Sequence, residues 1–147
     1  MKAAATIGQA LAAARLRLRD AGIPDAGLDA RVLVGHALGL SVSDLIGHPE
    51  RTLTDAGRHR IEALLDRRLR REPVAYITGG REFWSLPLSV TPAALIPRPD
   101  SETLIEDVLD DVSDRSAPLR VVDLGTGQLL LQRLFEHAKE FVGGGEA

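Results

Sequence analysis

Apolar side chains in the first 72 residues recur three or four positions apart, which is the spacing of one face of an α-helix. This period predicts helices over residues 6–20, 25–39 and 54–71. A shorter helix is predicted within "LSVSDLIGHPE" (40–50), where a serine can begin it and a glycine and a proline can end it. Four short helices with tight connections predict a small helical bundle. The predicted caps are Thr6, Thr54 and either Ser41 or Ser43, and the predicted core stripes are Ile7, Leu11, Ala14 and Leu18, then Leu28, Val32, Leu33 and His36, then Ile61, Leu64, Leu65 and Leu69.

The helical period stops at Pro73. Residues 73–99 contain five prolines and three patches rich in β-branched and aromatic residues, bounded by glycines and prolines. Patches of this kind between turn residues are typical of strands, so the segment is interpreted as a β-hairpin linker. The strand candidates are "AYIT" (75–78), "EFWSL" (82–86) and "LSV" (88–90), with Gly79-Gly80 and Pro87 between them. Tyr76, Phe83 and Trp84 are expected to pack at a hinge.

Residues 100–147 mix helical and strand patterns. A helix is predicted from Asp100 or Ser101, with acids in its early turns, where the helix dipole favours them. "LRVVDLG" (119–125) has the pattern of a strand that is apolar on both faces, as in a parallel sheet. Residues 128–142 are expected to form an amphipathic helix. The predicted domain organisation is therefore 1–72, 73–99 and 100–147.

Composition narrows the possible chemistry. The chain has no cysteine, which excludes disulfides, thiolate nucleophiles and cysteine-based zinc sites. Its four histidines lack the spacing of metal ligands, so no metal site is expected. No apolar run approaches the roughly 20 residues that cross a membrane, and we expect a cytoplasmic protein.

Charge is distributed unevenly along the chain. Residues 1–72 hold 12 Lys and Arg against 9 Asp and Glu, whereas residues 73–147 hold 6 against 12. A basic front half could face an acidic partner such as RNA. Solvated helix faces are the interpretation that we favour, and no sequence-specific nucleic acid binding is expected. The run "RRLRRE" (67–72) closes a predicted helix, where the helix dipole alone favours cations.

The stretch "VVDLGTG" (121–127) has the pattern of a ligand-binding turn. Gly125 and Gly127 allow a sharp turn and a close approach of a ligand to the backbone. Asp123 ends the predicted strand at the carboxyl edge of the sheet, where ligands bind in open α/β folds. The alternative is an ordinary strand-to-helix turn that requires glycine.

A longer block accompanies this turn. "REPVAYITGGREFWSLPLSVTPAALIPRPDSETLIE" (71–106) resembles the segment that joins the two domains of the HemK/PrmC family, the release factor glutamine methyltransferases. "REFWSLPL" and "LIPRPDSE" carry most of the resemblance, and "DLGTG" follows at the expected distance. The resemblance covers residues from about 5 to 127. It implies a mainly α chain with an N-terminal helical bundle, a β-hairpin linker, and the first strand and helices of a truncated Rossmann-like methyltransferase domain.

The resemblance also implies an activity. The family transfers a methyl group from S-adenosylmethionine to the glutamine amide in the Gly-Gly-Gln loop of a peptide chain release factor, and the helical domain helps to recognise that partner. By position, the cofactor-binding residues are Asp123, Gly125, Thr126, Gly127, Pro97, Arg98 and Glu102. No residue of the chain is predicted to be catalytic, because the Asn-Pro-Pro-Tyr motif that holds the glutamine amide does not occur.

The sequence departs from the family pattern after Gly127, where Gln128 and Leu129 stand in place of the expected continuation. We therefore expect an incomplete and inactive form of the methyltransferase. The alternative is a non-catalytic helical module that binds a release factor or a related partner, and a product without function is a third hypothesis. A truncated gene product, a frameshift and a natural short paralogue all stay open.

Overall fold

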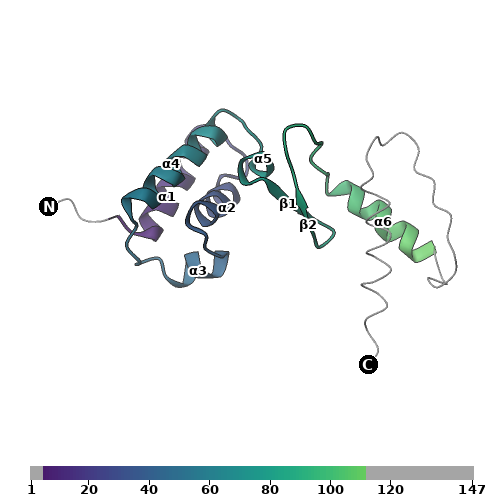
Figure 1. Ribbon diagram of the computed structural model, residues 1–147, viewed down its shortest axis with the longest axis horizontal. Coiled ribbons are helices and arrows are strands. Elements are labelled where there is room, and N and C mark those ends of the chain that lie inside the picture. The colour runs from purple at the N-terminus through teal and green to yellow at the C-terminus, as the bar shows by residue number, and fades with distance from the viewer. Residues whose placement is uncertain (1–4, 112–147) are drawn as a thin grey trace, which may run out of the picture. The chain divides into compact units, whose positions relative to one another are not determined.

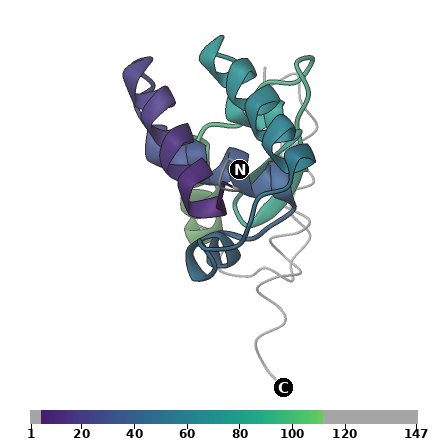
Figure 2. The ribbon, with the colours of Figure 1, turned by 90° about the vertical axis from the view of Figure 1, so that its left-hand side faces the viewer.

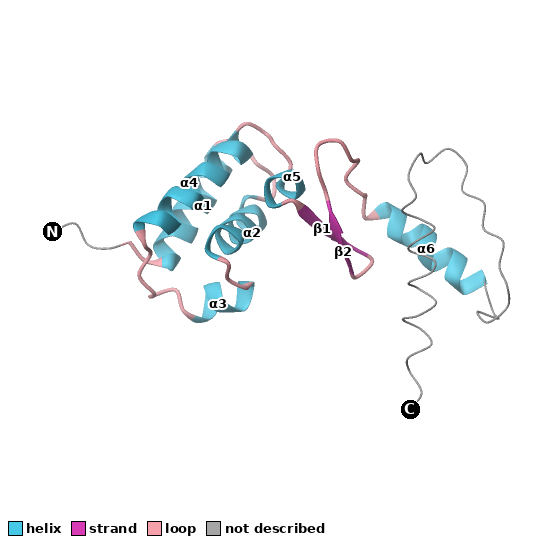
Figure 3. Cartoon of the chain, viewed as in Figure 1, coloured by secondary structure: helices cyan, strands magenta, loops and turns pink. Residues whose placement is uncertain are grey.

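The computed structural model describes residues 5–111, which are divided between two compact units with a boundary between Ile96 and Pro97 (Figure 1). The predicted strand at 119–125 and the predicted helix at 128–142 lie outside the described residues. The described part is mainly helical, as predicted, with one antiparallel hairpin (Figure 3). The first unit holds α1 (Ile7–Asp20), α2 (Ala26–Leu38), α3 (Val42–Gly47), α4 (Asp55–Leu69), α5 (Val74–Thr78), β1 (Gly80–Phe83) and β2 (Leu86–Ser89), and the second holds α6 (Asp100–Asp111).

The predicted capping residues begin their helices. The Thr6 side chain accepts a hydrogen bond from the Gln9 amide while the Gln9 side chain accepts one from the Thr6 amide, which is a complete capping box. Ser41 and Asp44 form the same arrangement at the start of α3. Thr54 caps α4 through the amide of Gly57 at 3.1 Å. These caps satisfy N–H groups that have no partner inside a helix.

The core of the first unit forms where α2 packs against both α1 and α4 (Figure 2). Leu18, Leu33 and Val34 are fully buried there. The predicted stripe of α2 is wrong in part, because Leu28 is 55% exposed and His36 is exposed as well. Besides Leu33 and Val34, the buried face carries small residues, which let neighbouring helices approach closely. These residues of α2 are Ala26, Ala30 and Ala37.

The prediction of a strand at "AYIT" is wrong, because these residues belong to the short helix α5. Pro73 begins the helix, and its carbonyl accepts hydrogen bonds from the Tyr76 and Ile77 amides at 3.0 and 3.1 Å. Gly79 ends the helix with a φ of 76°, a left-handed conformation that glycine adopts without steric cost. Ile77 is 5% exposed and joins the core of the helical bundle. Tertiary packing therefore overrides the β-propensity of this segment.

The predicted β-hairpin is present, but its turn lies elsewhere. β1 and β2 pair antiparallel, with Phe83 opposite Leu86. The turn is made by Trp84 and Ser85, with φ values of 47° and 62°, as in the two-residue type I′ turns that match the twist of a hairpin. Pro87 therefore lies inside β2 instead of separating two strands. A proline is tolerated there because each strand of a two-stranded sheet has an unpaired edge.

In the second unit, the structure describes α6 and the turn that leads into it. The helix spans Asp100–Asp111, as predicted, with Asp100 and Glu102 in its first turn. Ile105 and Leu109 are buried.

Candidate functional site

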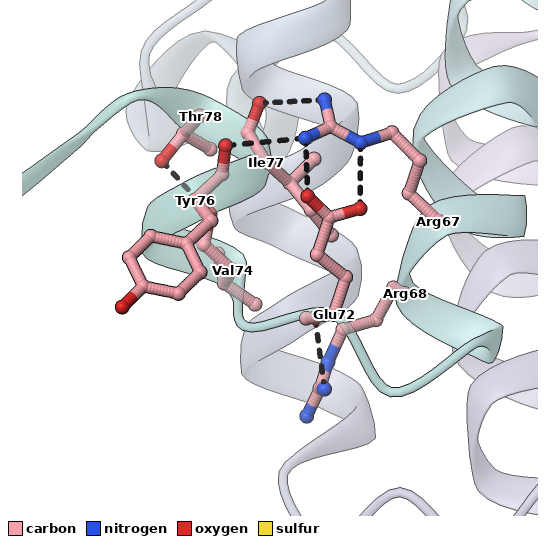
Figure 4. Close-up of polar contacts among 7 residues, drawn as sticks. All are labelled: Arg67, Arg68, Glu72, Val74, Tyr76, Ile77 and Thr78. Carbon is pink, nitrogen blue, oxygen red and sulfur yellow. Dashed lines mark hydrogen bonds and ion pairs between the residues drawn. The ribbon is translucent and has the colours of Figure 1, made fainter. Parts of the chain in front are cut away.

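Three arginines at the end of α4, here called the arginine cluster (Arg67, Arg68 and Arg71), connect segments that are distant in the sequence. Arg67 makes the largest set of bonds (Figure 4). Its Nε and Nη2 atoms donate to the two carboxylate oxygens of Glu72 at 2.8 and 2.5 Å. Nη2 and Nη1 also donate to the backbone carbonyls of Tyr76 and Ile77 at 3.2 and 3.4 Å. One side chain thus binds the loop after α4 and the end of α5.

The Arg67–Glu72 pair also changes the acidity of both groups. The hydrogen bonds from Arg67, followed by its charge, lower the pKa of Glu72. The same carboxylate raises the pKa of Arg67. Both side chains are about two-thirds covered, at 35% and 28% exposed. The charged forms of the pair are therefore favoured across the neutral pH range.

Arg68 forms the most buried ion pair among the described residues. Its Nε atom donates to Asp29 Oδ2 at 2.7 Å, and the side chains of Arg68 and Asp29 are only 17% and 10% exposed. Its Nη1 atom donates to the Glu72 carbonyl at 3.1 Å, as Figure 4 shows. The sequence reasoning missed Asp29. The available signal was an acid between alanines and leucines on a helix face, which requires a buried cation to neutralise it.

Arg71 completes the cluster. Its Nη1 and Nη2 atoms donate to the carbonyls of Gly22 and Ala21 at 3.1 and 2.8 Å, just after the end of α1. Arg71 itself has a φ of 68°, which is uncommon for a residue with a side chain. Arg67 and Arg68 lie in the last turn of α4, where the helix dipole favours cations, and the basic run also makes specific contacts. Arg67 binds α5, Arg68 binds α2 and Arg71 binds the residues after α1, while Arg67 and Arg68 both also bind Glu72.

The hairpin is attached to α5 at two points. The Tyr76 hydroxyl donates to the Ala94 carbonyl at 2.8 Å, beyond the end of β2. The amide of Val90 donates to the Gly79 carbonyl at 3.0 Å. The hydrogen bond of Tyr76 to Ala94 thus joins two segments of the first unit.

A shallow groove lies between α1 and α4. Its volume is about 270 Å³ and its walls are largely apolar. At its rim, Arg17 forms ion pairs with Glu62 and with Asp66, and the Glu62 hydrogen bond is the main cause of the raised pKa of Arg17. The apolar wall consists of Ala5, Ala10, Ala13, Ala14, Leu53, Ile61 and Leu65.

A second hollow of about 410 Å³ lies between α1 and α2. Gly8, Gly27 and Ala12 form part of its lining, with Arg15 and Arg31 beside them. Neither arginine has a carboxylate partner among residues 5–111. This face is therefore locally basic.

The structure describes three of the predicted cofactor-binding residues. Pro97, Arg98 and Glu102 lie together at the beginning of α6. The carbonyls of Arg98 and Pro99 accept hydrogen bonds from the Ser101 and Glu102 amides at 3.1 and 2.8 Å. Arg98 is exposed, and Glu102 is partly buried. Asp123, Gly125, Thr126 and Gly127 lie outside the described residues.

Two of the described residues that were predicted to bind a cofactor carry groups that bind polar ligands. A guanidinium such as that of Arg98 can pair with a carboxylate, and the Glu102 carboxylate can accept hydrogen bonds from hydroxyl or amino groups. Within residues 5–111, no group of three His, Asp or Glu side chains could hold a metal ion. In the same part of the chain, no helix is long and apolar enough to span a membrane.

Residues 5–96 thus define a class of protein module, a small helical bundle that carries a β-hairpin. Comparison with known families identifies it: residues 9–79 match the family described as the PrmC N-terminal domain. This segment therefore belongs to that family, and the resemblance drawn from the sequence is confirmed.

Three similar curated proteins carry the same name. The chain is 45% identical over 126 residues to the release factor glutamine methyltransferase of Bradyrhizobium diazoefficiens, covering 82% of this chain and 42% of that protein. It is 48% identical over 99 residues to the protein of the same name in Escherichia coli K12, covering 67% and 35%. It is 47% identical over 122 residues to the relative from Vibrio cholerae, covering 83% of this chain and 42% of that protein. The chain thus spans less than half the length of these relatives.

Proposed function

We propose that the first unit binds a peptide chain release factor, and that the chain derives from a release factor glutamine methyltransferase. The observation that carries the proposal is the match of residues 9–79 to the PrmC N-terminal domain, within a unit that folds around its own core. The names of the relatives supply the partner. The apolar groove between α1 and α4 is the candidate docking surface, because it is wide, shallow and bordered by ion pairs.

The proposed reaction is methyl transfer to the glutamine amide of the release factor. S-adenosylmethionine would supply the methyl group, with Pro97, Arg98 and Glu102 beside it and Asp123, Gly125, Thr126 and Gly127 in the turn. A neutral amide nitrogen is a weak nucleophile, so positioning would contribute more than base catalysis. The 147 residues contain no Asn-Pro-Pro-Tyr sequence to hold the amide. We therefore propose that the 147-residue chain binds the release factor but transfers no methyl group by itself.

Binding and catalysis can be separated in one set of experiments. Titration of the purified chain with a release factor should show saturable binding, while incubation with labelled S-adenosylmethionine should leave the Gly-Gly-Gln loop unlabelled. Absence of binding would overturn the main proposal. Label transfer to the glutamine would show that the chain is itself catalytic.

A matched pair of alanine substitutions tests the groove. Ala13 lines it and is exposed, whereas Ala63 is exposed on α4 outside it. Ala13→Glu places a charged side chain in the apolar groove and should weaken release factor binding by about 10-fold or more. Ala63→Glu should leave the affinity unchanged. Equal affinities for the two variants, with binding intact, would assign docking to another surface.

The alternative function is a module that binds a related partner and never takes part in methylation. The basic hollow beside Arg15 and Arg31 favours an acidic partner. A strong dependence of binding on salt, together with insensitivity to Ala13→Glu, would favour this alternative.

A further inference from the structure

The path from the helical bundle to the hairpin runs through α5, a helix of only five residues. A helix of this length has no stability of its own, because nucleation is costly and few internal hydrogen bonds repay it. Two interactions compensate. Ile77 is buried in the bundle core, and Arg67 binds the carbonyls of Tyr76 and Ile77 at the end of the helix.

Arg67 is suited to this role by its shape. A guanidinium presents five N–H donors in a rigid planar fork. Here the fork makes four hydrogen bonds at once, two to the Glu72 carboxylate and two to α5 carbonyls. Arg67 extends from α4, the longest helix of the bundle. The end of α5 is therefore bound to α4 at a fixed distance and direction.

The hairpin in turn has no partner sheet among the described residues, since β1 and β2 pair only with each other. An isolated two-stranded hairpin is marginally stable in water. Its base is attached to α5 by the Val90–Gly79 and Tyr76–Ala94 hydrogen bonds. These two hydrogen bonds therefore hold both ends of the hairpin to α5, so the hairpin is fixed in position wherever α5 is fixed.

We infer that the helical bundle and the β-hairpin form one rigid body, and that Arg67, with Glu72, is the positioning residue that fixes the hairpin on the bundle. The segment predicted as a β-hairpin linker is, up to Ala94, part of the recognition unit. This inference goes beyond the proposed function, because the rigidity exists before any partner binds. A release factor would then meet the helices and the hairpin as one preformed surface.

Distance measurements test this directly in the full chain. The chain has no cysteine, so spin labels can be attached at Ala63→Cys on α4 and Glu82→Cys on β1, both exposed positions. The unaltered background should give one narrow distance distribution between the labels. Arg67→Gln should broaden the distribution by about twofold or more and speed amide exchange of Val90 by about 10-fold.

The control is Arg58→Gln on the same helix. Arg58 pairs with Asp55 at 2.6 Å in an exposed i,i+3 bridge that does not contact α5. This variant should keep the narrow distribution. Arg67→Lys and Glu72→Gln preserve part of the contact and should give intermediate widths, even if Arg67→Gln does not fold.

Two outcomes would overturn the inference. One is a broad distribution in the unaltered background. The other is a distribution that stays as narrow in Arg67→Gln or Arg67→Lys as in Arg58→Gln, with the helix content retained. Release factor affinity is not needed for either outcome, so failure here is distinct from failure of the proposed function.

Discussion

Removing the carboxylate of Asp29 should destabilise the first unit more than any exposed charge substitution. Asp29 lies on the buried face of α2, and its partner Arg68 comes from α4. Asp29→Ala leaves the Arg68 guanidinium covered by protein without its counter-charge. A buried charge that loses its partner is costly, whereas the complete pair contributes little net stability.

The size of the effect follows from the geometry. At an effective dielectric constant of 20, two charges about 4 Å apart attract each other by about 4 kcal/mol. Loss of one partner of a buried pair costs about 3–5 kcal/mol. The lower end applies here, because Arg68 keeps the Glu72 carbonyl at 3.1 Å and is still 17% exposed. We therefore expect about 3 kcal/mol, or a drop of roughly 10–20 °C in the midpoint of thermal unfolding.

Urea unfolding of the full chain, followed by circular dichroism, measures this loss as a lower midpoint at an unchanged m-value. Asp55→Ala is the matched control, because it removes the exposed partner of Arg58 from a surface pair and should cost at most about 1 kcal/mol. In the double variant Asp29→Leu/Arg68→Met, no unpaired charge is left, so stability should return to near the wild-type value. The reasoning is refuted if Asp29→Ala and Asp55→Ala unfold at the same urea concentration.

Three further predictions concern packing and acidity. Gly35→Ala should destabilise the unit by about 1–3 kcal/mol, because a Cβ atom there would lie 2.9 Å from the Leu40 carbonyl oxygen; thermal unfolding measures this. Gly27→Ala, on the same helix, meets only ordinary contacts and should raise stability by about 0.5–1 kcal/mol in the same assay. Arg67 lowers the pKa of Glu72, so their pair stabilises the fold above the unfolded pKa of about 4.3, and this contribution is lost as the pH falls through the folded value. The stability difference between wild type and Glu72→Gln, measured by urea unfolding, should therefore shrink below about pH 5; a constant difference down to pH 3 would contradict this.

Helix positions could be predicted from the sequence because their signals are local. Thr6, Ser41 and Thr54 each precede an apolar period, and each caps the helix expected. The buried face of α2 could not be predicted in the same way. Its core residues include three alanines and an aspartate besides Leu33 and Val34, whereas the large apolar Leu28 is exposed. Which face is buried depends on the neighbouring helices, and size alone does not reveal it.

The strand prediction at residues 75–78 failed for a related reason. Val74, Ile77 and Thr78 have high β-propensity, yet the helix is stabilised by Arg67 and by burial of Ile77 in the bundle. In both cases the stabilising partners, Arg67 and the core residues around Ile77, lie outside the segment. The hairpin turn was missed because Trp84 and Ser85 occupy positions with positive φ where Asn and Gly are usual.

The residues of the candidate site likewise fall into those that the sequence predicted and those that it did not. Pro97, Arg98 and Glu102 were predicted from a motif, and they are close in the sequence, so their proximity at the start of α6 follows from local structure. The Asp29–Arg68 and Arg71 contacts join residues 39 to 50 positions apart, whereas Arg67 binds residues 5 to 10 positions away that approach it only because α5 folds back. No periodicity or composition argument detects such pairs.

The arginine cluster also restricts how the length of the chain can change during evolution. Arg67 and Arg68 lie in the last turn of α4, where each residue turns the helix by about 100°, and Arg71 lies just beyond the helix end. Inserting or deleting one residue between Arg67 and Glu72 would turn at least one of these side chains away from its partner. Changes in length are therefore disfavoured at this end of α4. The spacing within "RRLRRE" is thus as important to the fold as the charges themselves.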